Sequence, residues 1–101
     1  MKIEQHQFIV KGKGPLTVEV DSQARAVYVR FTHMHVAKTV PTLSDAMHIA
    51  VDLDEKGEVV GIEAVGVRHF SLHALLQWAR VKAPQMDYSR AQYAPAEYAA
   101  T

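Results

Sequence analysis

Residues 49–63 read Ile49-Ala50-Val51-Asp52-Leu53-Asp54-Glu55-Lys56-Gly57-Glu58-Val59-Val60-Gly61-Ile62-Glu63. On each side of the charged centre, apolar residues alternate with polar or small ones, which is the period of a half-buried strand. The centre, Asp54-Glu55-Lys56-Gly57, suits a tight turn, because Asp opens turns and Gly adopts the left-handed conformation at no steric cost. The stretch therefore predicts a β-hairpin.

Three more strands are expected before this hairpin. Leu16, Val18 and Val20 alternate with polar residues, Val27, Val29 and Phe31 do the same, and a weaker β-branched strand runs from Val36 to Val40. Pro41 ends the last of these, because proline cannot donate to a strand ladder. Together with the hairpin, they predict an antiparallel β-meander of four to five strands.

The period changes after Val67. Leu72, Leu75, Leu76 and Ala79 stand at positions i, i+3, i+4 and i+7, the stripe of an amphipathic helix. Ser71 is a natural N-cap, and Pro84 prevents continuation. We expect an α+β fold in which one C-terminal amphipathic helix packs on one face of the sheet.

This pattern divides the chain into three parts. Residues 1–15 form an N-terminal arm with a possible edge strand at Phe8-Ile9-Val10, and residues 16–83 form a single sheet-plus-helix domain. Residues 84–101 are rich in Tyr and Ala and show no clear period, so we expect a mobile tail.

Composition excludes several classes of protein. The 101 residues carry 11 Lys and Arg against 11 Asp and Glu, and no Cys. Zero net charge gives no general attraction to nucleic acid or membrane, and three bases over residues 67–83 make a thin patch. The lack of Cys excludes disulfides and thiolate metal cages. No apolar run approaches the ~20 residues of a membrane span, so we expect a cytoplasmic protein.

Two segments also resemble a known family. They are Asp21 with Val27-Tyr28-Val29-Arg30, and Val51-Asp52-Leu53-Asp54-Glu55-Lys56-Gly57-Glu58-Val59-Val60-Gly61-Ile62-Glu63. Over residues 16–66 the chain resembles a family of small bacterial proteins known as domain of unknown function 2283. It departs from the first motif, with Val20 in place of Tyr and Arg25 in place of Asp. The resemblance implies a small antiparallel sheet with a helix, no catalytic residues and, for such families, small toxins as partners.

Histidines are the candidate metal ligands. His33 and His35 would project from one face if the chain is extended there, and we take them as the candidate metal site. Zinc requires three or four ligands, and no third one is set by spacing. A loop role without metal is the alternative, and we expect no cofactor.

Alternation also gathers polar residues on the face of the sheet away from the helix. This polar-face cluster consists of Tyr28, Arg30, His48, Asp52 and Glu63. Such a set has the groups needed for general acid–base chemistry. It is equally typical of the solvated face of an antiparallel sheet with cross-strand ion pairs, so we assign no catalytic residue.

The width of the sheet favours self-association. Four or five strands spaced ~4.8 Å apart span about 19–24 Å, whereas one helix covers about 10–12 Å. Half of the apolar face would stay bare, and twofold dimers are the commonest oligomers. The expected interface residues are Phe70, Leu72, Leu76 and Trp78.

The leading functional hypothesis is a non-catalytic homodimeric protein-interaction module with a possible protein partner, and without nucleic acid or membrane. The alternatives are an antitoxin-like regulatory partner, and a small histidine-based metal-binding protein or hydrolase. Stoichiometric metal that is lost on changing His33 and His35 would favour the last of these.

Overall fold

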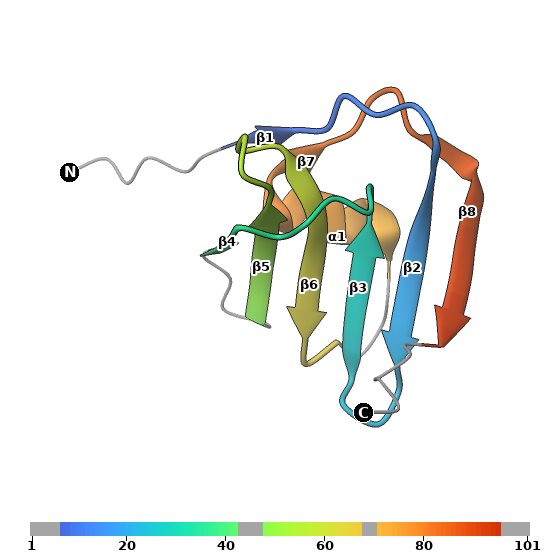
Figure 1. The fold of residues 1–101 in the computed structure, drawn as a ribbon. Helices are drawn as coiled ribbons and strands as arrows, with labels where there is room; N and C mark the ends of the chain where they lie inside the picture. The colour runs from blue at the N-terminus through green and yellow to red at the C-terminus, as the bar shows by residue number, and fades with distance from the viewer. Residues whose placement is uncertain (1–6, 43–47, 68–70, 96–101) are drawn as a thin grey trace.

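The computed structural model describes residues 7–42, 48–67 and 71–95 of the chain (Figure 1). The elements in chain order are β1 (Phe8–Ile9), β2 (Pro15–Asp21), β3 (Ala26–Arg30), β4 (Lys38–Pro41), β5 (His48–Leu53), β6 (Val59–Val65), α1 (Leu72–Ala79), β7 (Val81–Lys82) and β8 (Asp87–Pro95).

The hairpin predicted around residues 54–57 is confirmed as the turn between β5 and β6. Oδ1 of Asp54 accepts hydrogen bonds from the backbone N–H of Lys56 at 2.8 Å and of Glu58 at 2.9 Å. Gly57 has a φ of 81°, the left-handed conformation that favours glycine. Because the Asp54 carboxyl is occupied by the turn's own backbone, the acidic tip is explained as turn chemistry.

The α+β class is confirmed, and the main sheet has six strands in the order β4-β5-β6-β3-β2-β8. The expected count of four to five is therefore too low. A simple meander is also wrong, because β3 pairs antiparallel with β6 and not with β4. The register places Val29 and Val51 on either side of Ile62, so the apolar residues of three strands lie in one row.

The two end segments of the described chain run side by side (Figure 1). β1 pairs in parallel with β7, and β2 pairs in parallel with β8. The expected tail over residues 84–101 is therefore wrong for Asp87–Pro95, which form an edge of the main sheet, and residues 96–101 lie outside the described residues. The arm does contain a strand, Phe8–Ile9, but it joins β7 and not the main sheet.

The helix begins and ends much as its sequence predicts. Oγ of Ser71 accepts a hydrogen bond from the backbone N–H of Ala74 at 3.3 Å, which confirms the N-cap. Arg80 follows the last helical residue with a φ of 58° and donates its backbone N–H to the carbonyl of Gln77 at 3.1 Å. The chain then turns directly into β7.

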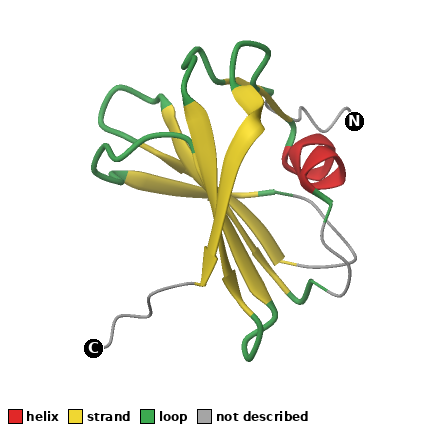
Figure 2. Ribbon diagram, turned by 90° about the vertical axis from the view of Figure 1, so that its right-hand side faces the viewer, coloured by secondary structure: helices red, strands yellow, loops and turns green. Residues whose placement is uncertain are grey.

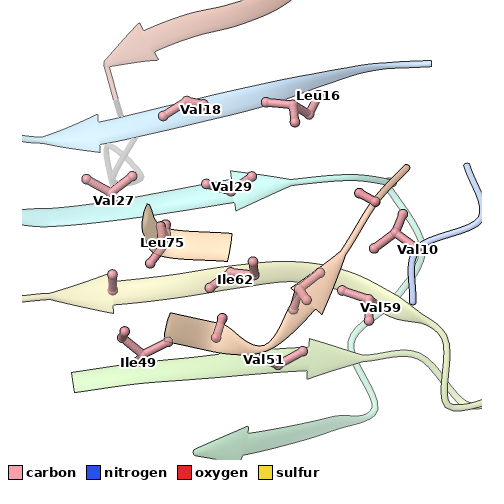
Figure 3. Packing of buried hydrophobic residues seen from close by; sticks show 14 of the residues in the cluster. Val10, Leu16, Val18, Val27, Val29, Ile49, Val51, Val59, Ile62 and Leu75 are labelled. Atoms are coloured by element: carbon pink, nitrogen blue, oxygen red, sulfur yellow. The ribbon is translucent and has the colours of Figure 1, made fainter. Parts of the chain in front are cut away.

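Helix α1 lies on one side of the sheet, against its apolar face (Figure 2). The strand residues of this core that have no exposed surface are Leu16, Val18, Val29, Val51, Ile62 and Ala64. Figure 3 shows Leu75 of α1 and Val10 of the β1–β2 connection among them. The remaining cover comes from Ala79, Val81, Ala83 and Met86, which are buried in the same cluster.

The expectation that half of the apolar face stays bare is therefore wrong for the described residues. One helix is indeed too narrow for six strands, but β1, β7 and residues 83–86 complete the cover. The sequence argument for a dimer loses its basis here. Any interface has to lie elsewhere on the molecule.

Candidate functional site

The polar-face cluster lies on the face of the sheet opposite α1, where alternation predicts it. β3 contributes Tyr28 and Arg30, β5 contributes His48 and Asp52, and β6 contributes Glu63. In the register of the sheet, Tyr28 stands opposite Glu63, and Asp52 stands opposite Gly61 of β6. The structure joins only some of these side chains.

Tyr28 and Asp52 are linked across the strand that separates them. The phenol oxygen of Tyr28 donates a hydrogen bond to Oδ2 of Asp52 at 2.9 Å, and Oγ1 of Thr39 in β4 donates to Oδ1 at 2.6 Å. Asp52 is only 8 % exposed. A carboxyl group buried this deeply needs hydrogen-bond partners, and each of its oxygens has one.

Gly61 makes this link possible. A Cβ atom at Gly61 would lie 2.5 Å from Cζ and from Oη of Tyr28, closer than real Cβ atoms approach other atoms. The tyrosine ring therefore crosses β6 in contact with its backbone. Glycine in a strand interior often marks such an approach, so the position of Gly61 is explained by the ring above it.

Arg30 extends the network toward β2. Its Nε donates to Oε1 of Glu19 at 3.2 Å, and its guanidinium lies 4.9 Å from the centre of the Tyr28 ring, within cation–π range. Thr39, Asp52, Tyr28, Arg30 and Glu19 therefore form one connected polar network over the outer face. His48 and Glu63 are exposed on the same face and bond to none of these five residues.

The electrostatics of this network favour a structural role. Burial of the ring, and then its hydrogen bond to Asp52, raise the pKa of the Tyr28 phenol above its ordinary value. Tyr28 is therefore a neutral donor at physiological pH. Both oxygens of Asp52 already accept hydrogen bonds, so the carboxyl group presents no unoccupied oxygen to a substrate. The network fastens four strands together.

The candidate metal ligands have no third partner among the residues that the structure describes. His33 and His35 lie in the connection between β3 and β4, and both are exposed. Within residues 7–42, 48–67 and 71–95, no three His, Cys, Asp or Glu side chains gather in a way that could hold an ion. Two exposed imidazoles in a loop fall short of the three or four ligands that zinc takes.

The predicted interface residues differ in how much of their surface is exposed. Leu72 and Leu76 are partly buried and pack against the core, so the fold already uses much of their surface. Trp78 is 45 % exposed, and Phe70 lies outside the described residues.

A groove beside α1 was not anticipated from the sequence. It has a volume of about 510 Å³ and is lined by Gln7, His73, Leu76, Gln77, Arg80, Val81, Lys82, Ala83, Pro84 and Tyr88. The sequence signal that could have identified it is the basic segment 67–83, which contains no acidic residue. That segment is too sparse for nucleic acid, but its last two bases meet in one groove.

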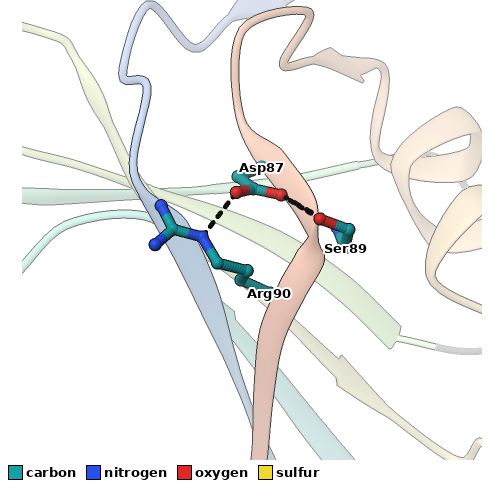
Figure 4. Close-up of polar contacts among 3 residues, drawn as sticks. All are labelled: Asp87, Ser89 and Arg90. Carbon is teal, nitrogen blue, oxygen red and sulfur yellow. Dashed lines mark hydrogen bonds and ion pairs between the residues drawn. The ribbon is translucent and has the colours of Figure 1, made fainter.

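The outer edge of β8 is a second surface that the sequence did not predict. Pairing with β2 moves from Pro15–Asp87 to Thr17–Gln92, so two steps along β2 match five along β8 and three residues bulge out. Asp87 holds the bulge, accepting hydrogen bonds from Ser89 and, at 2.6 Å, from Nε of Arg90 (Figure 4). The bond to Ser89 and then the bond to Arg90 lower the pKa of the Asp87 carboxyl.

No protein-family model, curated protein or solved structure matches this chain significantly. The resemblance over residues 16–66 therefore stays a prediction. Among the described residues, no helix has the length and hydropathy that a membrane span requires.

Proposed function

We propose that the protein is a cytoplasmic, non-catalytic interaction module that forms a homodimer through β8. A cytoplasmic location is compatible with the cysteine-free sequence, which needs no oxidising compartment to form disulfides. The observation that carries the dimer is the open outer edge of β8, which has β2 on one side and no strand of the described chain on the other. An exposed strand edge offers unpaired backbone groups to a further strand.

The two edges of the sheet differ in how well they are protected. β4 has four residues, among them Lys38 and Pro41, and both residue types discourage strand addition. β8 has nine residues, and among residues 87–93, whose exposure the structure describes, the exposed ones are Tyr88, Ser89, Arg90, Gln92 and Tyr93. β8 also ends in a proline, Pro95, and its first half carries the bulge, but the strand is more than twice as long as β4 and residues 92–94 continue in regular register with β2. β8 is therefore the edge more open to a partner.

The charge on β8 permits pairing with a second copy. Its two charged residues, Asp87 and Arg90, neutralise each other within the strand at 2.6 Å. Each β8 strand therefore has no net charge, and two such strands paired antiparallel around a twofold axis would not repel each other electrostatically. Their union would extend the six-stranded sheet continuously into the partner, which is the closed, self-complementary arrangement favoured by dimers.

The test is the mass of the particle in solution. Light scattering over the micromolar range should give about twice the 11.3 kDa of one chain. The variant Gln92→Lys adds a positive charge to each of the two apposed β8 strands, and it should raise the dimer dissociation constant several-fold. The matched control Gln23→Lys adds the same charge at the exposed β2–β3 turn and should leave dimerisation unchanged.

Two results would overturn the proposal. One is the mass of a single chain at every concentration. The other is a dimer that Gln92→Lys does not weaken, because this would place the interface away from β8.

A further inference from the structure

The groove beside α1 is built from one flank of the helix and the segment that follows it. His73, Leu76 and Gln77 stand at i, i+3 and i+4, so they share one side of the helix, and Arg80, which follows the last helical residue, lines the same groove. Val81 and Lys82 of β7 and the connection to β8 form the opposite wall.

The far wall is held in place by its own hydrogen bonds. The phenol oxygen of Tyr88 donates to the carbonyl of Ala83 at 2.6 Å, and the backbone N–H of Met86 donates to the same carbonyl at 3.4 Å. Met86 is buried in the core beneath this turn. The groove is therefore formed without a ligand, which reduces the ordering that binding would require.

The charge of the lining has one sign. Arg80 and Lys82 are exposed, and no Asp or Glu lines the groove. Neither Arg80 nor Lys82 forms an ion pair with another described residue, because the ion pairs of the described chain are Arg30–Glu19 and Arg90–Asp87. The groove therefore favours a negatively charged occupant.

The rest of the lining favours an apolar group beside the negative charge. Leu76, Val81, Ala83 and Pro84 give the groove an apolar floor. The groove lies at the C-terminal end of α1, where the helix dipole is negative, so any anion there depends on the side chains of Arg80 and Lys82 and not on backbone groups. Two permanent cations are also few for a nucleic acid, whose binding depends on neutralising many phosphates. A ligand that carries separate carboxylates beside an apolar side chain fits this lining better than a phosphate or a nucleic acid does.

We propose that this groove binds an acidic peptide segment of another protein, with an apolar side chain on the floor and carboxylates beside Arg80 and Lys82. The volume of about 510 Å³ lies within the roughly 300–1,000 Å³ of ligand pockets and suits a short segment. The groove does not depend on pairing through β8.

The test is selection from a phage library of random short peptides on the full chain. The selected peptides should be enriched in Asp and Glu next to a large apolar residue. The double variant Arg80→Ala/Lys82→Ala should lose this enrichment. The control Lys13→Ala/Lys56→Ala removes the same charge from exposed sites outside the groove and should keep it.

A selected peptide, made synthetically with a fluorescent label, is then titrated with the protein, and its binding is followed by fluorescence anisotropy. Its dissociation constant should rise on the order of ten-fold in Arg80→Ala/Lys82→Ala, since each exposed charge pair contributes modestly. It should also rise with salt. The control double variant should bind like the wild type.

Three outcomes would overturn the proposal. The first is a selection that yields no acidic peptides, or that yields the same peptides with the Arg80→Ala/Lys82→Ala variant as with the wild type. The second is displacement of the labelled peptide by a single-stranded oligonucleotide at a lower concentration than the unlabelled peptide requires. This result would make the groove a nucleic-acid site. The third is a dimer of the wild type that Arg80→Ala/Lys82→Ala converts to single chains, because this would make a second copy of the chain the occupant of the groove. The variant Gln92→Lys tests pairing through β8 separately.

Discussion

Tyr28 and Asp52 lie on strands that are not neighbours, yet the phenol of Tyr28 donates a 2.9 Å hydrogen bond to the carboxyl of Asp52 over Gly61 of the strand between them. The bond thus spans three strands of the sheet. It links the β3–β2 half of the sheet directly to the β5–β4 half. Within the sheet, backbone hydrogen bonds connect these two halves through β6, the strand between them.

Removing the Tyr28 hydroxyl should destabilise the fold. Tyr28→Phe deprives Oδ2 of the buried Asp52 of its donor, and we expect a loss of about 1–2 kcal/mol in the free energy of unfolding, measured by urea denaturation. Tyr88→Phe is the matched control, because it removes a bond to a neutral backbone carbonyl at a more exposed site. Equal losses in both variants would contradict a special role for the Tyr28–Asp52 pair.

Adding a methyl group beneath the ring should also be costly. Gly61→Ala places a Cβ atom 2.5 Å from the ring of Tyr28, and we expect a loss of about 1–3 kcal/mol in unfolding free energy. In a Tyr28→Ala background the same change should cost much less, because the clashing ring is gone. Gly14→Ala, with nothing within 4 Å of its added Cβ, should be nearly neutral. Additive losses in the double variant would refute the contact.

The Tyr28 network predicts an alkaline limb of stability. Because the folded pKa of Tyr28 is raised, the unfolded chain releases its phenol proton first, near pH 10. The stabilisation is complete below that pH and is lost as pH rises through the folded pKa. Stability should fall by at most about 1.4 kcal/mol per pH unit from this group. Urea unfolding of Tyr28→Phe above pH 10 should show a shallower fall, and an unchanged slope would contradict the assignment.

Arg80 offers a way to separate stability from peptide binding. It holds a positive φ of 58°, which glycine adopts at lower cost, so Arg80→Gly should stabilise the fold by about 0.5–1 kcal/mol in thermal or urea unfolding. The same variant should weaken the acidic peptide. Arg25→Gly, at a φ of 52° in the β2–β3 turn, should stabilise the fold and leave the peptide unaffected. A destabilised Arg80→Gly would show that the arginine side chain contributes more packing than its backbone strain costs.

The central elements were predictable because each carries a local signal. Asp54 and Gly57 define the hairpin, and Ser71 caps the helix. β8 was missed since its three-residue bulge breaks the alternation of an exposed strand. β1 and β7 have two residues each, too short for any period. The pairing of β3 with β6 depends on contacts far apart in sequence, which local patterns do not encode.

The outer face was predictable in its membership but not in its bonding. Alternation places Tyr28 and Asp52 on one face, whereas their contact depends on β6 lying between their strands and on the missing side chain of Gly61. The partners Glu19 and Thr39 come from strands whose neighbours were unknown. The groove beside α1 arises from the turn into β7, which no periodic signal announces.

The parallel pairing of β2 with β8 limits when the sheet can be completed during synthesis. Val18 and Tyr93 are register partners although 93 − 18 = 75 positions separate them along the polypeptide. Closing so large a loop carries an entropic cost that is recovered only at the end. During synthesis the outer side of β2 stays unpaired until residues 87–95 have left the ribosome. A nascent chain halted before that point therefore exposes a second open strand edge to its neighbours.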